Sequence, residues 1–167
     1  MKKWTILLLA LFCAAASAAA QDFSVVNPRC EYRDEPVGIN TLTPRFSWQV
    51  AARERGFSQS ACELIVGDDR EVVASGHGNL WRMKRKDAQS LHIPYAGKPL
   101  KSGEEYYWSV RVWDAAGKVS AWSPVNRFST GLMSPDAWSG ARWIAMEVQP
   151  DSMRIVPGQE YNKLKIG

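Results

Sequence analysis

Histidine and cysteine are scarce in this chain of 167 residues, which holds two of the first and three of the second. His77 and His92 share no zinc-site spacing with the cysteines, and neither stands in a recognisable cysteine-nucleophile context. The sequence therefore predicts no metal centre, no cysteine-dependent catalysis and no cofactor.

Long apolar runs are missing after the first twenty residues. Within those twenty, Lys2 and Lys3 precede an apolar run over 6–16 and a small-residue cleavage site at 18–20. This order is typical of a secretory signal peptide. We expect residues 1–20 to be removed and the mature chain to be exported, to the periplasm, the cell surface or the medium.

Two other uses of this leader are less well supported. An uncleaved anchor needs about 20 apolar residues to span a bilayer, and this run is shorter and rich in alanine. A lipid-acceptor cysteine needs a small residue before it, whereas Phe12 precedes Cys13. After cleavage we expect no attachment to a membrane.

A large charge of one sign is also absent. The formal net charge is +4, and removing Lys2 and Lys3 with the leader lowers it to +2. Such a balance implies no polyanionic partner. Export further disfavours nucleic acid as a partner.

Helical periodicity is the last absence, because nothing of period 3.6 persists from Val25 onward. Short strand-like runs separated by turn residues take its place. We predict strands over 25–32, 45–51, 61–66, 89–93, 104–113 and 125–130, with a weaker one over 71–74, and Pro44 marking the start of the second. Seven short strands predict an all-β fold, a fibronectin type III or immunoglobulin-like sandwich.

Residues 104–113 carry the clearest strand pattern. One face would hold Tyr106, Trp108, Val110 and Val112, and the other Tyr107, Ser109, Arg111 and Trp113. Leu100 stands six residues before Tyr106, the spacing of a tyrosine corner, in which the phenol bonds back to nearby backbone. We expect Trp48 and Trp108 in the core and Trp122 packed beside Arg111.

Two cysteines remain after the leader, Cys30 and Cys62, and both fall on the apolar parity of predicted strands. Export permits a disulfide between them. Two buried thiols that act as small hydrophobic groups are the alternative.

The sequence changes character after Gly131. We expect a β-sandwich over 22–131, a linker over 132–140, and in 141–167 the incomplete start of a second β domain. That last segment has eight large apolar residues in 27, too few to offset the cost of ordering it alone.

Several segments, in this order, resemble one family. They are residues 29–32, 36–39, 43–48, 94–103, 107–123 and 141–144. Together they resemble the N-terminal module of bacterial α-L-rhamnosidases of glycoside hydrolase family 78. The resemblance implies an enzyme that removes terminal α-L-rhamnose from plant glycans with inversion. Its catalytic glutamates lie in an (α/α)6 barrel that follows several β domains.

No catalytic residue of that family can be carried over, because only 27 residues follow Gly140. The resemblance therefore implies a non-catalytic accessory module, inactive by itself, whose partners are the downstream domains of the hydrolase. One departure is visible: after Trp81, Arg82 to Lys86 replaces the usual Asp-Ser-Gly turn of the family.

Candidate sites are few. Adjacent carboxylates at 34–35, 68–69 and 104–105 suit turns and surface better than glycosidase chemistry, because sequence neighbours point to opposite faces of a strand. The basic run 82–86 could meet an acidic glycan, or form a solvated loop. Tyr107 and Trp113 could stack on a rhamnose-containing glycan or contact the next domain. A stand-alone glycan-binding or adhesive surface module is thus the alternative function.

Overall fold

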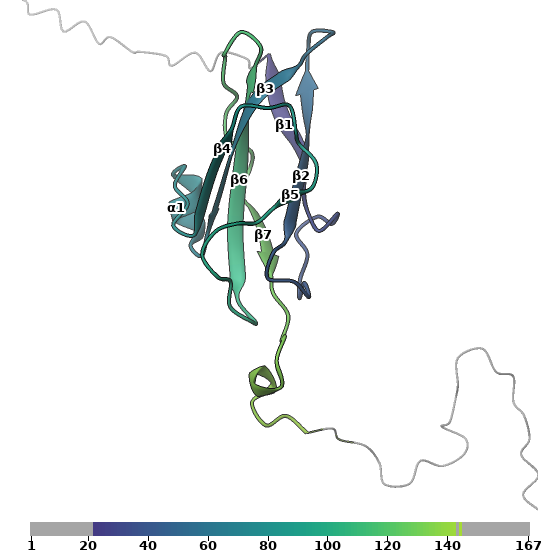
Figure 1. Cartoon of the computed structure of the whole chain (residues 1–167), viewed down its shortest axis with the longest axis vertical. Coiled ribbons are helices and arrows are strands. Elements are labelled where there is room, and N and C mark those ends of the chain that lie inside the picture. The colour runs from purple at the N-terminus through teal and green to yellow at the C-terminus, as the bar shows by residue number, and fades with distance from the viewer. Residues whose placement is uncertain (1–21, 143, 145–167) are drawn as a thin grey trace, which may run out of the picture.

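The computed structural model describes residues 22–142 and 144, and two β-sheets face each other across one core (Figure 1). The expected leader, 1–20, lies outside the described residues. So does the expected second domain, 141–167, apart from residues 141, 142 and 144.

One sheet has three strands and the other has four. The first, in the order β1-β2-β5, consists of β1 (Phe23–Cys30), β2 (Arg45–Ala52) and β5 (Ile93–Pro94). The second, in the order β4-β3-β6-β7, consists of β4 (Trp81–Arg85), β3 (Gln59–Gly67), β6 (Glu105–Asp114) and β7 (Asn126–Ser129). All paired strands are antiparallel. The predicted all-β sandwich is confirmed.

Alternate residues of each strand fill the space between the sheets. On β6, Tyr106, Trp108, Val110 and Val112 are all buried, as their parity predicts. They meet Phe46 and other residues from β2 and β3, and the Phe46 and Trp108 rings lie 4.7 Å apart between centroids. Burial of these large apolar groups drives the two sheets together.

Two polar contacts hold buried aromatic side chains. The Tyr106 hydroxyl accepts a hydrogen bond from the Lys101 amide at 2.7 Å, which confirms the tyrosine corner. The Trp48 indole N–H donates to the Gln59 side chain at 3.1 Å. Gln59 in turn donates to the Asp87 and Gln89 carbonyls, so it ties the chain between β4 and β5 to the core.

The weak strand predicted over 71–74 is wrong: a short helix, α1 (Arg70–Ala74), occupies this segment. The Asp69 carboxylate caps it by accepting from the Glu71 and Val72 amides at 2.8 and 3.1 Å. Val73 is buried at 1 % exposure. The cap and this one packed side chain outweigh the β preference of the two valines.

The basic run 82–86 is a strand over most of its length, so the predicted loop is wrong. Residues 81–85 form β4, the edge strand beside β3, in which Met83 faces inward while Arg82 and Lys84 face outward. Charged side chains suit an edge strand, because they discourage pairing with another chain. The strand predicted over 89–93 shrinks to the two residues of β5.

A 3-10 turn, η1 (Pro135–Trp138), lies within the predicted linker and is capped by the Ser134 hydroxyl. None of the helices in the described part of the chain has the length and apolar character of a membrane span.

Candidate functional site

The outer face of the four-stranded sheet contains a buried carboxylate. Glu63 of β3 is 1 % exposed and lies between Arg82 of β4 and Arg111 of β6. Its two oxygens pair with the two guanidinium groups, at 2.6 Å to Arg82 Nη2 and 2.7 Å to Arg111 Nη2. Each arginine also donates through Nε to the same oxygen, at 2.7 Å from Arg82 to Oε1 and 2.8 Å from Arg111 to Oε2, so each carboxylate oxygen accepts two charge-assisted hydrogen bonds from one arginine.

Burial by itself raises the pKa of Glu63, but the hydrogen bonds and charges of Arg111 and Arg82 outweigh burial and lower the pKa. Glu63 is therefore ionised at neutral pH. A buried ionised carboxylate is tolerated here because both partners reach it in good geometry.

Cations and tryptophan rings alternate beside this triad. The Lys84 ammonium lies 4.6 Å from the centre of the Trp113 ring, and the Arg111 guanidinium lies 5.1 Å from the same ring and 4.6 Å from that of Trp122. We call Lys84, Trp113, Arg111 and Trp122 the cation–aromatic ladder. The predicted packing of Trp122 beside Arg111 is confirmed.

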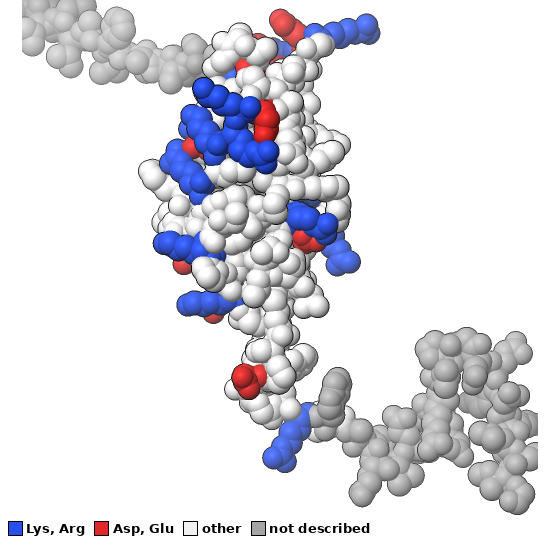
Figure 2. Space-filling model, viewed as in Figure 1, with Lys and Arg blue, Asp and Glu red and all other residues white. Residues whose placement is uncertain are grey.

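The charged side chains of β4 continue past this ladder. Arg85 pairs with Asp87 at 2.7 Å, and Lys86 is exposed at the end of the strand. We call Arg82, Lys84, Lys86 and Arg111 the basic face, which leaves out Arg85 because it shares the inward parity of Met83. In Figure 2, the largest group of lysine and arginine side chains, drawn in blue, lies over β4.

The structure does not bring Tyr107 and Trp113 together. Both are half-buried on the outer parity of β6, six residues apart, which is about 20 Å along a strand. Trp113 has Lys84 and Arg111 over its ring, while the Tyr107 hydroxyl donates to Glu105. One sugar could not stack on both rings.

The carboxylates of the described residues that show shifted pKa values are held by donors. A hydrogen bond from Arg45 lowers the pKa of Glu31, and one from Tyr107, with the charge of Arg127, lowers that of Glu105. A hydrogen bond from Lys118 lowers that of Asp22. The general acid of a glycosidase needs a raised pKa, so these groups and Glu63 are unsuited to that role.

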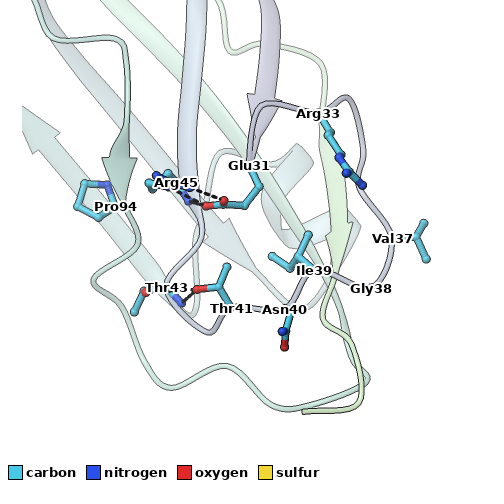
Figure 3. Close-up of a pocket in the computed structure, with 10 residues that line it drawn as sticks. All are labelled: Glu31, Arg33, Val37, Gly38, Ile39, Asn40, Thr41, Thr43, Arg45 and Pro94. Carbon is cyan, nitrogen blue, oxygen red and sulfur yellow. Dashed lines mark hydrogen bonds and ion pairs between the residues drawn. The ribbon is translucent and has the colours of Figure 1, made fainter.

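An open cleft lies where the chain leaves the sandwich. Figure 3 shows its ten lining residues, among which the Arg45 guanidinium is paired to the neighbouring Glu31 at 2.8 Å. The loop over 36–39 forms one wall and also holds the exit from β7. Ser129 N donates to Pro36 O, Ile39 N to Ser129 O, and Gly131 N to Ile39 O, at 2.8 to 3.0 Å. We call this the exit cleft.

Cys30 and Cys62 are free thiols in the structure, both buried, and they belong to different sheets. The structure holds them as the two buried thiols of the second alternative, and the disulfide stays a prediction. Burial raises the pKa of Cys30 to about 12 and that of Cys62 to about 11, so neither is a reactive thiolate. Among the described residues, no three His, Cys, Asp or Glu side chains gather to hold a metal ion.

Known proteins identify the domain. Residues 25–134 match the family model described as "Rha78A-like, N-terminal immunoglobulin domain". The chain belongs to this family. As implied by the sequence resemblance, it carries the N-terminal immunoglobulin-like module of α-L-rhamnosidases.

Individual relatives agree with this assignment. An "Alpha-L-rhamnosidase" of Streptomyces avermitilis is 40% identical over 122 residues, which is 72% of this chain and 12% of that protein. One of Formosa agariphila is 32% identical over 149 residues, 86% of this chain and 15% of that protein. The chain thus spans about an eighth of the length of these relatives.

A solved structure shows the same fold. The crystal structure of Streptomyces avermitilis alpha-L-rhamnosidase complexed with L-rhamnose superposes with a TM-score of 0.66 at 38% identity. The match covers 70% of this chain and 11% of that one. The sandwich is therefore a small part of a much larger protein in that enzyme.

Sequence reasoning missed Glu63 and the strand beside it. The available signal was a single acidic residue at an outward position of an otherwise apolar run, Ala61 to Val66. Its two arginine partners lie 19 and 48 residues away, and only the pairing of β3 with β4 and β6 shows that they converge.

Proposed function

We propose that this chain is the non-catalytic N-terminal module of an exported α-L-rhamnosidase that acts on rhamnose-containing plant glycans. Family membership over residues 25–134, with coverage of about an eighth of the curated relatives, carries the proposal. The lowered pKa values of Glu31, Glu63 and Glu105 make these groups unsuited to the general-acid role in glycoside hydrolysis.

Its mechanical role is to support the domain that follows. The hydrogen bonds between the loop 36–39 and residues 129–131 hold the exit of the chain in one direction. Val37 and Leu132 stand beside that exit, 77% and 45% exposed. Apolar side chains left open at this end suit a contact with a neighbouring domain.

A chimaera of the Streptomyces avermitilis enzyme tests this role. Its own N-terminal module is replaced by residues 22–134 of this chain, and the comparison protein lacks the module altogether. We expect the chimaera to hydrolyse an aryl α-L-rhamnoside and to melt several degrees above the deletion variant. A chimaera no more stable than the deletion variant would overturn the support role.

A matched pair of substitutions locates the contact. Val37 lies beside the exit cleft, near the Glu105 end of β6. Val119 lies in the turn after β6, at the Asp114 end of the same strand, and each is changed to Asp. We expect Val37→Asp to lower the melting temperature of the chimaera but not that of the isolated sandwich. Val119→Asp should leave both unchanged, and equal effects of the two would contradict docking at the exit.

The alternative function, a stand-alone glycan-binding or adhesive surface module, draws support from the basic face. An antibody to the sandwich, used on extracts of the source organism, separates the two. A product far heavier than the 18.7 kDa chain supports the rhamnosidase module, and a product of that mass or less supports the alternative.

A further inference from the structure

The basic face lies on one part of the outer surface. In register, Glu63 of β3 pairs with both Lys84 of β4 and Arg111 of β6. These pairs lie toward the Asp114 end of β6, while the exit from β7 lies at the Glu105 end. A domain docked at the exit cleft would therefore leave the basic face open.

Positive charge is concentrated there. Of the four cations of the basic face, Arg82 and Arg111 share one carboxylate, Glu63, which leaves an excess of three charges. The formal charge of the whole chain is only +4. The low overall charge therefore conceals a local field that would attract an anion.

The cations are also held in place before any ligand arrives. Arg82 and Arg111 are fixed by Glu63, and Lys84 by the ring of Trp113. A cation already held in one conformation loses less entropy when it binds an anion than a free side chain does. The contacts with Glu63 and Trp113 therefore lower the entropic cost of binding an anion at these cations.

The spacing suits a polymer. Arg82 and Lys84 alternate along β4, so their Cα atoms are about 6.6 Å apart, and Lys86 follows in the bend just after the strand. β4 is an edge strand with no further strand beside it in the described sheet. An extended chain with repeated single negative charges could follow this row.

We propose that the basic face binds a polysaccharide that carries free carboxylate groups, along β4. The choice of a saccharide over other polyanions rests on the proposed function, since α-L-rhamnosidase relatives act in a glycan setting. Such binding would hold a rhamnosidase on acidic glycan while leaving the exit cleft to the next domain.

Calorimetry with polygalacturonate tests the proposal on the purified chain. Fully methyl-esterified polygalacturonate is the uncharged comparison polymer. We expect binding to the free acid only, and its loss as the ionic strength rises from about 0.1 M to 1 M, where the Debye length falls from about 10 to 3 Å. Absence of binding to the free acid at low salt would overturn the proposal.

Matched lysine variants locate the site. Lys84→Gln with Lys86→Gln removes two charges from the basic face, and Lys98→Gln with Lys101→Gln removes two from the exposed connection between β5 and β6. We expect the first pair to weaken affinity about fivefold and the second to change it less than about twofold. Equal losses would mean attraction to net charge alone, and would overturn the assignment.

Two further comparisons test which class of polyanion binds and whether the Trp113 ring of the cation–aromatic ladder contributes to affinity. Tighter binding of a DNA duplex or of anionic lipid vesicles than of polygalacturonate would reject a saccharide partner. Trp113→Ala keeps every charge but removes the ring beneath Lys84, so we expect affinity to fall while Trp113→Phe restores it. These outcomes do not depend on the chimaera, so this proposal and the support role can fail separately.

Discussion

The two faces of the four-stranded sheet each bury side chains on β3, but by different means. On the inner face, Leu64 and Val66 of β3 and Trp108 of β6 are at most 1 % exposed and contact apolar groups. On the outer face, Glu63 is equally buried but contacts two arginines. Consecutive residues of one strand, β3, thus contribute Glu63 to the outer face and Leu64 to the inner face.

The difference shows which face tolerates change. Apolar packing is non-directional, so the inner face depends on the volume and shape of its side chains. An ion-pair triad depends on each partner, because removing one leaves the others without compensation. The stability of the inner face therefore depends on side-chain volume, and that of the outer face around Glu63 depends on complete charge pairing.

The largest effect should come from the inner face. Trp108→Ala removes a fully buried ring and should lower the free energy of unfolding by about 3 to 5 kcal/mol. Urea denaturation of the purified chain measures it. Trp138→Ala, in the exposed η1 turn, is the control and should change stability by less than about 0.5 kcal/mol.

Glu63→Ala should cost less, about 1 to 3 kcal/mol. The two arginines lose their carboxylate, but their side chains are 51% and 27% exposed and can be partly hydrated by water. Glu104→Ala, at an exposed glutamate, serves as the control in the same urea titration. If Glu63→Ala and Glu104→Ala have the same free energy of unfolding, the triad of Glu63, Arg82 and Arg111 contributes nothing to stability.

Acid should weaken the outer face before it affects apolar packing. The folded pKa of Glu63 lies below its unfolded value of about 4.3, so its stabilisation is complete above about pH 5. It is lost as the pH falls through the folded pKa. Glu63→Gln lacks this loss, so the difference in unfolding free energy between wild type and variant should shrink on acidification. A difference that grows instead would contradict a lowered pKa.

Tyr106→Phe tests a single hydrogen bond at the edge of the core. The variant keeps the ring against Phe128 but leaves the Lys101 amide without the hydroxyl, which should cost about 0.5 to 1.5 kcal/mol. Thermal unfolding compares it with Tyr107→Phe on the outer parity. A larger loss in the outer variant would reverse the expected order.

The smallest effect on stability should come from the lysines of the basic face. Lys84→Gln with Lys86→Gln should change the free energy of unfolding by less than about 0.5 kcal/mol, because both side chains are exposed. The urea midpoint measures this directly. A marked destabilisation would mean that the ladder serves folding first.

Local patterns predicted the inner face well. The alternation of apolar residues along β6 predicted that Tyr106 and Trp108, with Val110 and Val112, lie in the core. The six-residue spacing from Leu100 to Tyr106 predicted the tyrosine corner. Such patterns succeed because burial on one side of a strand repeats every two residues. α1 was missed because a cap and one packed valine decide so short a helix.

By itself, the sequence determined the sandwich, its core aromatic residues and the family of the chain, since these depend on period-2 burial and on motifs read in order. Only the tertiary structure decided the outer face: that β4 is a strand, that Glu63 meets Arg82 and Arg111, and that Lys84 lies over Trp113. The physical reason is distance along the chain. Charges 19 and 48 residues apart interact strongly only after strand pairing brings them within contact.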